Sequence, residues 1–383
     1  MERSEAIERK VHIISEIKMD IVIVVVIFVI IALFFDYSNG LNDAANALAT
    51  TVSTGALSPK KTLILGVICE FLGAVIVVYL TLWLGSIPFF KTVADTMGKI
   101  VALPIVGDTL STGVFSIEWL GIIMCIGLLG AMLWNIVTWY FGIPVSASHA
   151  LIGGMCGSAY SALGTDAIKI EVVITAVSAL IISPLIAIPT AYLLMKLIYY
   201  LVRHSTPDIK ERFRKGVILS SAAFAFSHGA NDGQKTMGII TVFLISAGLW
   251  NLSPHGTIEP PLWVVIACAV AIALGVATGG FRVMKTVGMK IFKLRYEHGF
   301  NAQAVSTAII LGNSFIGFPV STTHVITTSV MGTGSAKRIS AVKWGIGKKI
   351  IITWIITIPA CFIFTVLLYF MVALLLGFPI SFY

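Results

Sequence analysis

Gly40-Leu41-Asn42-Asp43-Ala44 and Gly229-Ala230-Asn231-Asp232-Gly233 are two related phrases, one in each half of the chain, and strongly apolar sequence surrounds both. A carboxylate at such a place lies at membrane depth, where an ionised aspartate is costly unless it has a partner. Because this cost recurs in both halves, the phrases predict a polar site built from two internal repeats, with one contribution from each.

The composition is typical of an integral membrane protein. Of the 383 residues, 57% are hydrophobic and 11% are charged, whereas a soluble domain has about 25% charged residues. Several apolar runs reach the roughly 20 residues that a helix needs to cross a bilayer. The clearest are Met19–Phe35, Thr62–Leu84, Trp119–Phe141, Leu262–Gly280 and Ile350–Leu376. We therefore expect an all-α polytopic protein of the plasma (inner) membrane, with about 10–12 transmembrane segments.

The basic residues predict the topology. The net charge of +8 comes largely from Lys and Arg in three segments, at 203–215, 282–295 and 337–349. Such clusters between apolar spans mark cytoplasmic loops, so the charge does not indicate a nucleic-acid partner. Each half then has about five crossings by this rule, and an odd number makes the second half run opposite to the first. Both termini are expected on the extracellular or periplasmic side.

These patterns predict two inverted-topology repeats. We expect an N-terminal extension at residues 1–18, a first membrane repeat at 19–202, a basic cytoplasmic linker at 203–216 and a second repeat at 217–383. Two short, Gly-rich pairs of segments, at 119–163 and 300–332, return the chain to the side from which it came. They are interpreted as helical hairpins, whether or not each arm spans fully.

A second pair of phrases supports the duplication. Gly142-Ile143-Pro144-Val145-Ser146-Ala147-Ser148-His149 matches Gly317-Phe318-Pro319-Val320-Ser321-Thr322-Thr323-His324, with Gly, Pro, Val, Ser and His at the same spacing. Gly-x-Pro breaks a helix, and proline is favoured in the first turn of a new one. The hydroxyls that follow would lie at the cap and first turn, where free N–H groups form an anion site.

The two pairs of phrases together predict co-transport of an oxyanion with a cation. The Asn-Asp phrases offer carboxylates, amide carbonyls and exposed backbone carbonyls, which suit Na⁺ or another hard cation. Candidate phosphate ligands are Asn42, Asn231, Ser146, Ser148, Ser321, Thr322, Thr323 and Lys235. Candidate cation ligands from the phrases are Asn42, Asp43, Asn231 and Asp232, with the two aspartates as the Na⁺ ligands.

Several side chains have more than one interpretation. His149 and His324 are either structural partners of the helix caps or proton carriers, and Ser148 or Thr323 could simply bond to its own backbone. Glu70 lies in an apolar run, where an unpaired carboxylate is costly, which favours a function. Lys235 directly follows the second Asn-Asp phrase, whereas Arg282 could be only a topology determinant.

At these phrases the chain resembles the inorganic phosphate transporter (PiT) family. Gly40–Ala47, His228–Lys235 and Pro319–His324 carry the resemblance, which runs from about Phe34 to the last span. The Gly-Gln-Lys ending of the second phrase is similar to the prokaryotic branch. The resemblance implies inverted repeats, roughly twelve helical segments, phosphate as the substrate and coupling to Na⁺ or H⁺. It also implies a transport role for Glu70.

One position departs from the sodium-coupled relatives. They carry a second glutamate after a Gly-Phe pair, whereas this chain reads Gly299-Phe300-Asn301-Ala302-Gln303. Gln303 keeps an oxygen ligand but loses the charge, so Glu70 and Gln303 complete the candidate cation set while the stoichiometry stays open.

The sequence thus predicts a secondary-active phosphate transporter coupled to Na⁺ by alternating access. The alternatives are a proton-coupled carrier of phosphate or of a metal–phosphate complex, and a sulfate transporter. A channel or membrane receptor is a rival from another class, and no nucleophile–base pair suggests an enzyme. The expected partners are phosphate, Na⁺ and the lipid bilayer, with a homodimer left open and no cofactor.

Overall fold

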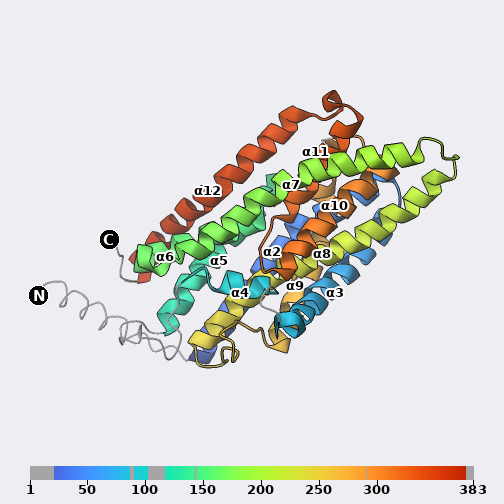
Figure 1. Ribbon diagram of the computed structural model, residues 1–383. Helices are drawn as coiled ribbons and strands as arrows, with labels where there is room; N and C mark the ends of the chain where they lie inside the picture. The colour runs from blue at the N-terminus through green and yellow to red at the C-terminus, as the bar shows by residue number, and fades with distance from the viewer. Residues whose placement is uncertain are drawn as a thin grey trace, which may run out of the picture.

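The computed structural model describes residues 21–86, 90–101, 117–141, 143, 145–290 and 292–376, with the side chains of 44–47, 86, 280–290 and 376 excepted. The predicted N-terminal extension, the side chain of Arg282 and the residues Gly142 and Pro144 lie outside this description. The described chain is almost entirely helical (Figure 1). Its long helices are α2 (Ile21–Thr54), α3 (Pro59–Trp83), α5 (Ile117–Phe141), α6 (Ala147–Leu163), α7 (Ile170–Val202), α8 (Ile209–Ser246), α9 (Leu262–Lys290), α10 (Tyr296–Phe315), α11 (Thr322–Lys337) and α12 (Trp344–Leu376). The short elements are α4 (Val93–Gly98), η1 (Leu84–Ser86), η2 (Thr165–Ala167) and η3 (Ile339–Ala341).

The outer helices have the surface of a membrane protein. Six of the described helices (α2, α3, α5, α7, α9 and α12) are long and apolar enough to cross a bilayer. Large apolar side chains lie on their outer faces, as with Leu185 at 62%, Ile355 at 71% and Leu374 at 79% exposure. Lipid chains cover such surfaces, and the backbone bonds of a helix satisfy its polar groups within the hydrocarbon layer. The described structure is therefore that of an all-α polytopic membrane protein.

Helix α8 has the opposite character, since it is less apolar and lies in the interior. From Ser227 to Ser246 every one of its residues is buried. Its 38 residues give it a length of about 57 Å, more than the hydrocarbon thickness of a bilayer. Exposed charged residues such as Lys210, Glu211 and Arg212 lie near its beginning, whereas the other helices enclose the polar residues of its buried part, as expected for intramembrane polar groups.

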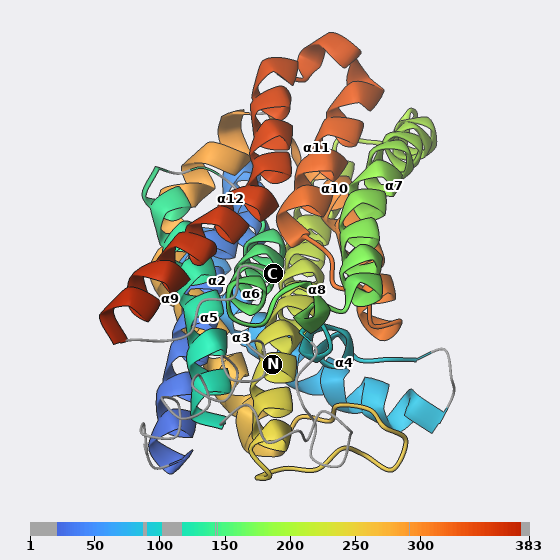
Figure 2. The same ribbon diagram turned by 90° about the vertical axis from the view of Figure 1, so that its left-hand side faces the viewer.

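The contacts between helices repeat across the two halves. The correspondence follows chain order: α2, α3, α5, α6 and α7 of the first repeat match α8, α9, α10, α11 and α12 of the second. Each principal contact between these long helices then has an equivalent contact between the matching helices. Helix α2 packs on α9 as α8 packs on α3, and α5 packs on α6 as α10 packs on α11. Figure 2 shows the outermost pair: α12 lies across α5 and α6, and α7 lies beside α10 and α11. The hairpins α5–α6 and α10–α11 thus hold equivalent places.

The corresponding helices α2 and α8 cross in opposite directions. Along the crossing, Asp36 meets Thr236, Asn39 meets Asp232, and Asp43 meets His228. Residue numbers therefore rise along α2 in the direction in which they fall along α8. Two corresponding helices that cross antiparallel are related by a two-fold rotation perpendicular to them, which is the geometry of an inverted repeat.

Glycines let the main chains touch at equivalent positions of the two repeats. A Cβ on Gly40 would collide with the carbonyl of Ile272 on α9, and a Cβ on Gly229 would collide with the carbonyl of Glu70 on α3. Small residues allow this close approach of helices within a membrane. Because Gly40 and Gly229 correspond in the repeats, Glu70 and Ile272 also occupy corresponding places.

One expectation about local structure was wrong. The Asn-Asp phrases lie within the continuous helices α2 and α8, so their backbone carbonyls belong to helical ladders and are not exposed ligands. Helix α8 begins at Ile209, so the second part of the predicted linker, from residue 209 on, is helical. Likewise, α9 continues to Lys290, so much of the second basic segment is helical.

Candidate functional site

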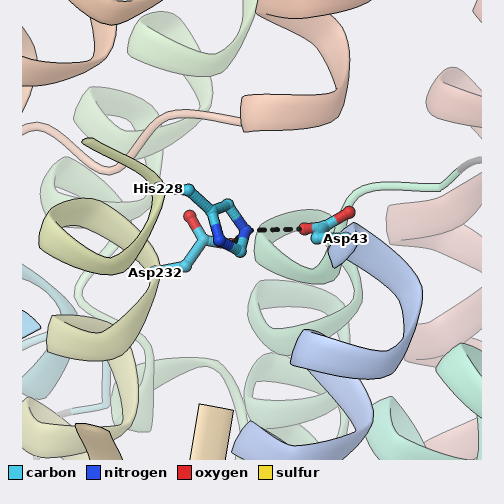
Figure 3. A group of neighbouring side chains, drawn as sticks. All are labelled: Asp43, His228 and Asp232. Atoms are coloured by element: carbon cyan, nitrogen blue, oxygen red, sulfur yellow. Dashed lines mark ion pairs between the residues drawn. The ribbon is translucent and has the colours of Figure 1, made fainter. Parts of the chain in front are cut away.

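Two carboxylates and an imidazole meet where α2 crosses α8. His228 Nε2 lies 3.6 Å from Asp43 Oδ2 and 3.5 Å from Asp232 Oδ2, and all three side chains are buried. Figure 3 shows the His228 ring pointing from α8 toward Asp43 on α2. Ligand atoms of the three residues lie within 4.8 Å of one another, close enough to hold one cation. The two predicted aspartates are thus brought together, and His228 joins them.

Lys235 neutralises Asp232 from one turn further along α8. Its Nζ lies 2.7 Å from Asp232 Oδ1, 2.5 Å from Ser148 Oγ and 3.1 Å from the carbonyl oxygen of Val320. The side chain is 1% exposed, and an ammonium has three N–H donors. Each donor therefore has an oxygen partner, so the buried charge is both paired and hydrogen-bonded.

The same set of oxygens recurs around Asp43. Thr323 Oγ1 lies 2.8 Å from Asp43 Oδ1 and 3.1 Å from the carbonyl oxygen of Val145, so its single O–H group is shared between these two acceptors. By the spacing of the repeated phrases, Asp43 corresponds to Asp232, Thr323 to Ser148 and Val145 to Val320. Thr323 joins Asp43 to the Val145 carbonyl directly, whereas Lys235 joins Asp232 to Ser148 and Val320. In each set the hydroxyl and the carbonyl come from different hairpins.

The Pro-Val-Ser phrases begin helices, as predicted. Ser146 caps α6 and accepts a hydrogen bond from the His149 amide at 3.3 Å, and Ser321 caps α11 and accepts one from the His324 amide at 3.3 Å. This is the standard side-chain cap of a helix N-terminus. Thr322 follows in the first turn of α11, with its Oγ1 3.5 Å from Asp43 Oδ2. The first turns of both hairpin helices therefore lie beside the carboxylates.

The two asparagines fasten the hairpins to the crossing helices. Asn42 Nδ2 donates to the carbonyl of Asn135 at 2.9 Å, near the end of α5. Asn231 Nδ2 donates to Ser314 Oγ at 3.0 Å, and its Oδ1 accepts from the Val320 amide at 3.2 Å. Asn42 is thus bonded to α5, and Asn231 to the end of α10 and to the segment that leads into α11.

Glu70 contacts the site through His228. Its Oε1 is paired with His228 Nδ1, and both side chains are completely buried. The corresponding residues of the other repeat are Ile272 and Asn39, and Asn39 Nδ2 donates to Asp232 at 3.2 Å. One half thus uses an amide where the other uses an imidazole held by a carboxylate, so the two halves differ in charge at equivalent places.

Gln303 belongs to a different polar group. Its Oε1 accepts from Ser220 at 2.7 Å, and its Nε2 donates to Thr51 at 3.1 Å and also to Thr50. Thr50 lies seven residues beyond Asp43 on α2, which is about 10 Å along a helix. The contacts of Gln303 therefore place it about two turns away from the carboxylate cluster.

His149 and His324 pack against each other between the two hairpins. Their ring centroids are 4.7 Å apart, and His324 also stacks on Trp354 of α12 at 3.6 Å. Their amides are the donors of the two serine caps. This geometry agrees with the interpretation of both residues as structural partners of the helix starts.

Two site residues were not predicted. His228 was visible in the sequence four residues before Asp232, a spacing that puts both on one helix face. Asn39 has the same spacing to Asp43 in the other repeat. The position shared by His228 and Asn39 could have been found by aligning the two halves beyond the Asn-Asp dipeptides.

The comparison with known proteins decides the family. Residues 39–365 match the model of the phosphate transporter family. The chain belongs to this family. Its members move phosphate across membranes, so the protein is an inorganic phosphate transporter and not an enzyme.

Relatives over nearly the whole length carry the same function in their names. The chain is 40% identical to a probable low-affinity inorganic phosphate transporter of Bacillus subtilis, over 89% of this chain and 95% of the relative. It is 38% identical to one of Rhizobium meliloti, over 89% and 94%. In fold it is similar to a solved sodium-dependent phosphate transporter, with a TM-score of 0.77, 24% identity, and 92% and 99% coverage.

Proposed function

We propose that this transporter couples phosphate movement to Na⁺ by alternating access. Phosphate binds beside the first turns of α6 and α11, with the hydroxyls of Ser146, Ser148 and Thr322 among its candidate ligands. Na⁺ binds at the carboxylates, and the loaded site moves between the two sides at reduced net charge. Neutralising the anion in this way lowers the electrostatic cost of carrying it through a low-dielectric interior.

One observation carries the proposal: two equivalent aspartates meet two equivalent helix starts at the centre of the bundle. The positive end of a helix dipole and its unpaired N–H groups favour an anion. Carboxylate and hydroxyl oxygens are ligands for a hard cation. The arrangement therefore supplies both kinds of ligand within one buried region. The similarity in fold to a sodium-dependent phosphate transporter is consistent with this choice of cation.

Purified protein in proteoliposomes tests this directly. We expect labelled phosphate to enter when an inward Na⁺ gradient is imposed, and to do so equally well when an ionophore collapses the proton gradient. Asp43→Asn keeps the shape of the side chain but removes its charge, and should lower Na⁺-driven uptake at least about tenfold, equivalent to 1.4 kcal/mol. Equal incorporation into liposomes is the control.

The same assay decides between the alternatives. Uptake driven by a pH gradient in Na⁺-free buffer would contradict Na⁺ coupling and favour the proton-coupled carrier. Phosphate uptake that requires a divalent cation would favour a metal–phosphate complex, and competition by excess sulfate would measure selectivity.

A further inference from the structure

We infer that the Lys235 ammonium occupies the second of two cation sites, as a tethered charge in place of a transported Na⁺. The inference rests on the proposed Na⁺ coupling and deepens it. It assigns different roles to the two aspartates, although the repeat makes them equivalent.

The first observation is the surroundings of the ammonium. Lys235 Nζ contacts a carboxylate oxygen of Asp232, the hydroxyl of Ser148 and the carbonyl of Val320 at 2.5–3.1 Å. These three hard oxygens come from three different segments: α8, the first turn of α6 and the stretch of chain before α11. A small monovalent cation seeks the same kind of ligand set. The three N–H donors of the ammonium are matched by these three oxygens, so none is left for phosphate in this arrangement.

The second observation is the equivalent set in the other repeat. Asp43, Thr323 and Val145 supply the same carboxylate, hydroxyl and carbonyl, and the hydroxyl-to-carbonyl contacts match at 3.1 Å and 3.2 Å. The residue that corresponds in sequence to Lys235 is Asn46, which carries no charge. The chain therefore has two versions of one oxygen set. A lysine ammonium lies within the set at Asp232, whereas asparagine stands at the corresponding position for the set at Asp43.

The oxygen sets at Asp232 and Asp43 consequently differ in whether they bind a Na⁺ from solution. The carboxylate of Asp232 has its counter-charge in every turnover, because a lysine cannot leave with the phosphate. The set at Asp43 is the one that binds and releases Na⁺. The ammonium also holds α8 to both hairpins through Ser148 and Val320, as a bound ion would.

Counting bound Na⁺ tests the inference without relying on transport. Radioactive Na⁺ is titrated into purified wild-type protein and Lys235→Met in detergent, without phosphate. We expect Lys235→Met to bind about one more Na⁺ per chain, because the buried Asp232 loses the ammonium that balances its charge. The matched control, Asp232→Asn/Lys235→Met, should return to the wild-type number. Lys235→Gln keeps two amide donors for the same oxygens and serves as a second variant, with the same expected gain.

The outcomes separate the inference from the proposed function. An unchanged Na⁺ count in both Lys235 variants overturns the inference, and a loss of phosphate affinity with that unchanged count identifies Lys235 as a phosphate ligand instead. Absence of Na⁺ binding by the wild type contradicts Na⁺ coupling itself. A gain that persists in the double variant also overturns the inference, because the added ion would then not be held by Asp232.

Discussion

At the scale of single residues, the site is asymmetric although its backbone frame is repeated. Asp43 and Asp232 are equivalent, but their neighbours on α8 and α2 are an imidazole and an amide respectively. The imidazole comes together with Glu70, whose counterpart is the apolar Ile272. The two differences between the repeats occur together, because a buried glutamate needs a partner and a buried imidazole that faces carboxylates needs a group to orient it.

This pairing predicts non-additive effects of mutations at Glu70 and His228. Glu70→Gln removes the charge, and His228→Asn copies the amide of the other repeat. Each single change should lower Na⁺-driven phosphate uptake more than about tenfold, while the double variant should be no worse than the more severe single variant. Residues in direct contact show coupling of about 0.5–3 kcal/mol. Initial uptake rates of the four proteins measure it, and strictly additive losses would contradict the pairing.

At the scale of the helices, the starts of α6 and α11 are specified locally, whereas the neighbours of each helix are not. Gly-x-Pro followed by hydroxyl residues predicted both helix starts, and in the structure Ser146 and Ser321 each accept a hydrogen bond from the amide three residues further on.

The caps predict a graded effect on stability. Ser321→Ala removes the acceptor and should destabilise the protein by about 1 kcal/mol, whereas Ser321→Gly should cost only a few tenths. Thermal unfolding in detergent, without phosphate, measures both. If alanine and glycine prove equally harmless, while phosphate affinity falls, the hydroxyl of Ser321 serves the anion and not the helix.

Close packing of helices predicts that an added methyl group is harmful at Gly229 and harmless at Gly312. A Cβ there meets the main chain of α3 at Glu70, which cannot yield as a flexible side chain would. Gly229→Ala should therefore abolish transport and lower the yield of folded protein. Gly312→Ala is the matched control, because a Cβ at that position of α10 meets open space. Folded yield and uptake of both variants can be compared in one preparation, and a fully active Gly229→Ala protein would show that α3 and α8 can separate.

At the scale of the whole molecule, the order and number of the long helices followed from apolar runs and basic segments. The continuity of α2 and α8 did not, because Gly-Leu-Asn-Asp and Gly-Ala-Asn-Asp contain residues that disfavour helix interiors. Tertiary contacts outweigh that preference: Asn42 and Asn231 bond to the hairpins. Contacts such as Glu70 with His228 join positions 158 residues apart, and periodicity within a segment carries no information about them.

The topology remains a prediction from charge, and it is directly measurable. Single cysteines at exposed loop positions, in a chain whose own cysteines are replaced, should separate into two classes with a membrane-impermeant maleimide. His204, in the turn between α7 and α8, should be protected in intact cells, and His255, between α8 and α9, should be labelled. The reverse labelling pattern would show that the orientation in the membrane is opposite to the predicted one, while the inverted repeat itself would be unaffected.

The antiparallel crossing of α2 and α8 has a consequence for the resting state. In a molecule whose two halves were identical, exchanging their conformations would convert an inward-facing form into an outward-facing form of equal free energy. Apart from the asymmetry of the membrane itself, the residues that differ between the halves make the two orientations unequal. Lys235, the Glu70–His228 pair and the polar group at Gln303 are such residues. In the proposed alternating-access cycle, the side chains that break the symmetry of the site therefore bias the side of the membrane to which the unloaded carrier opens.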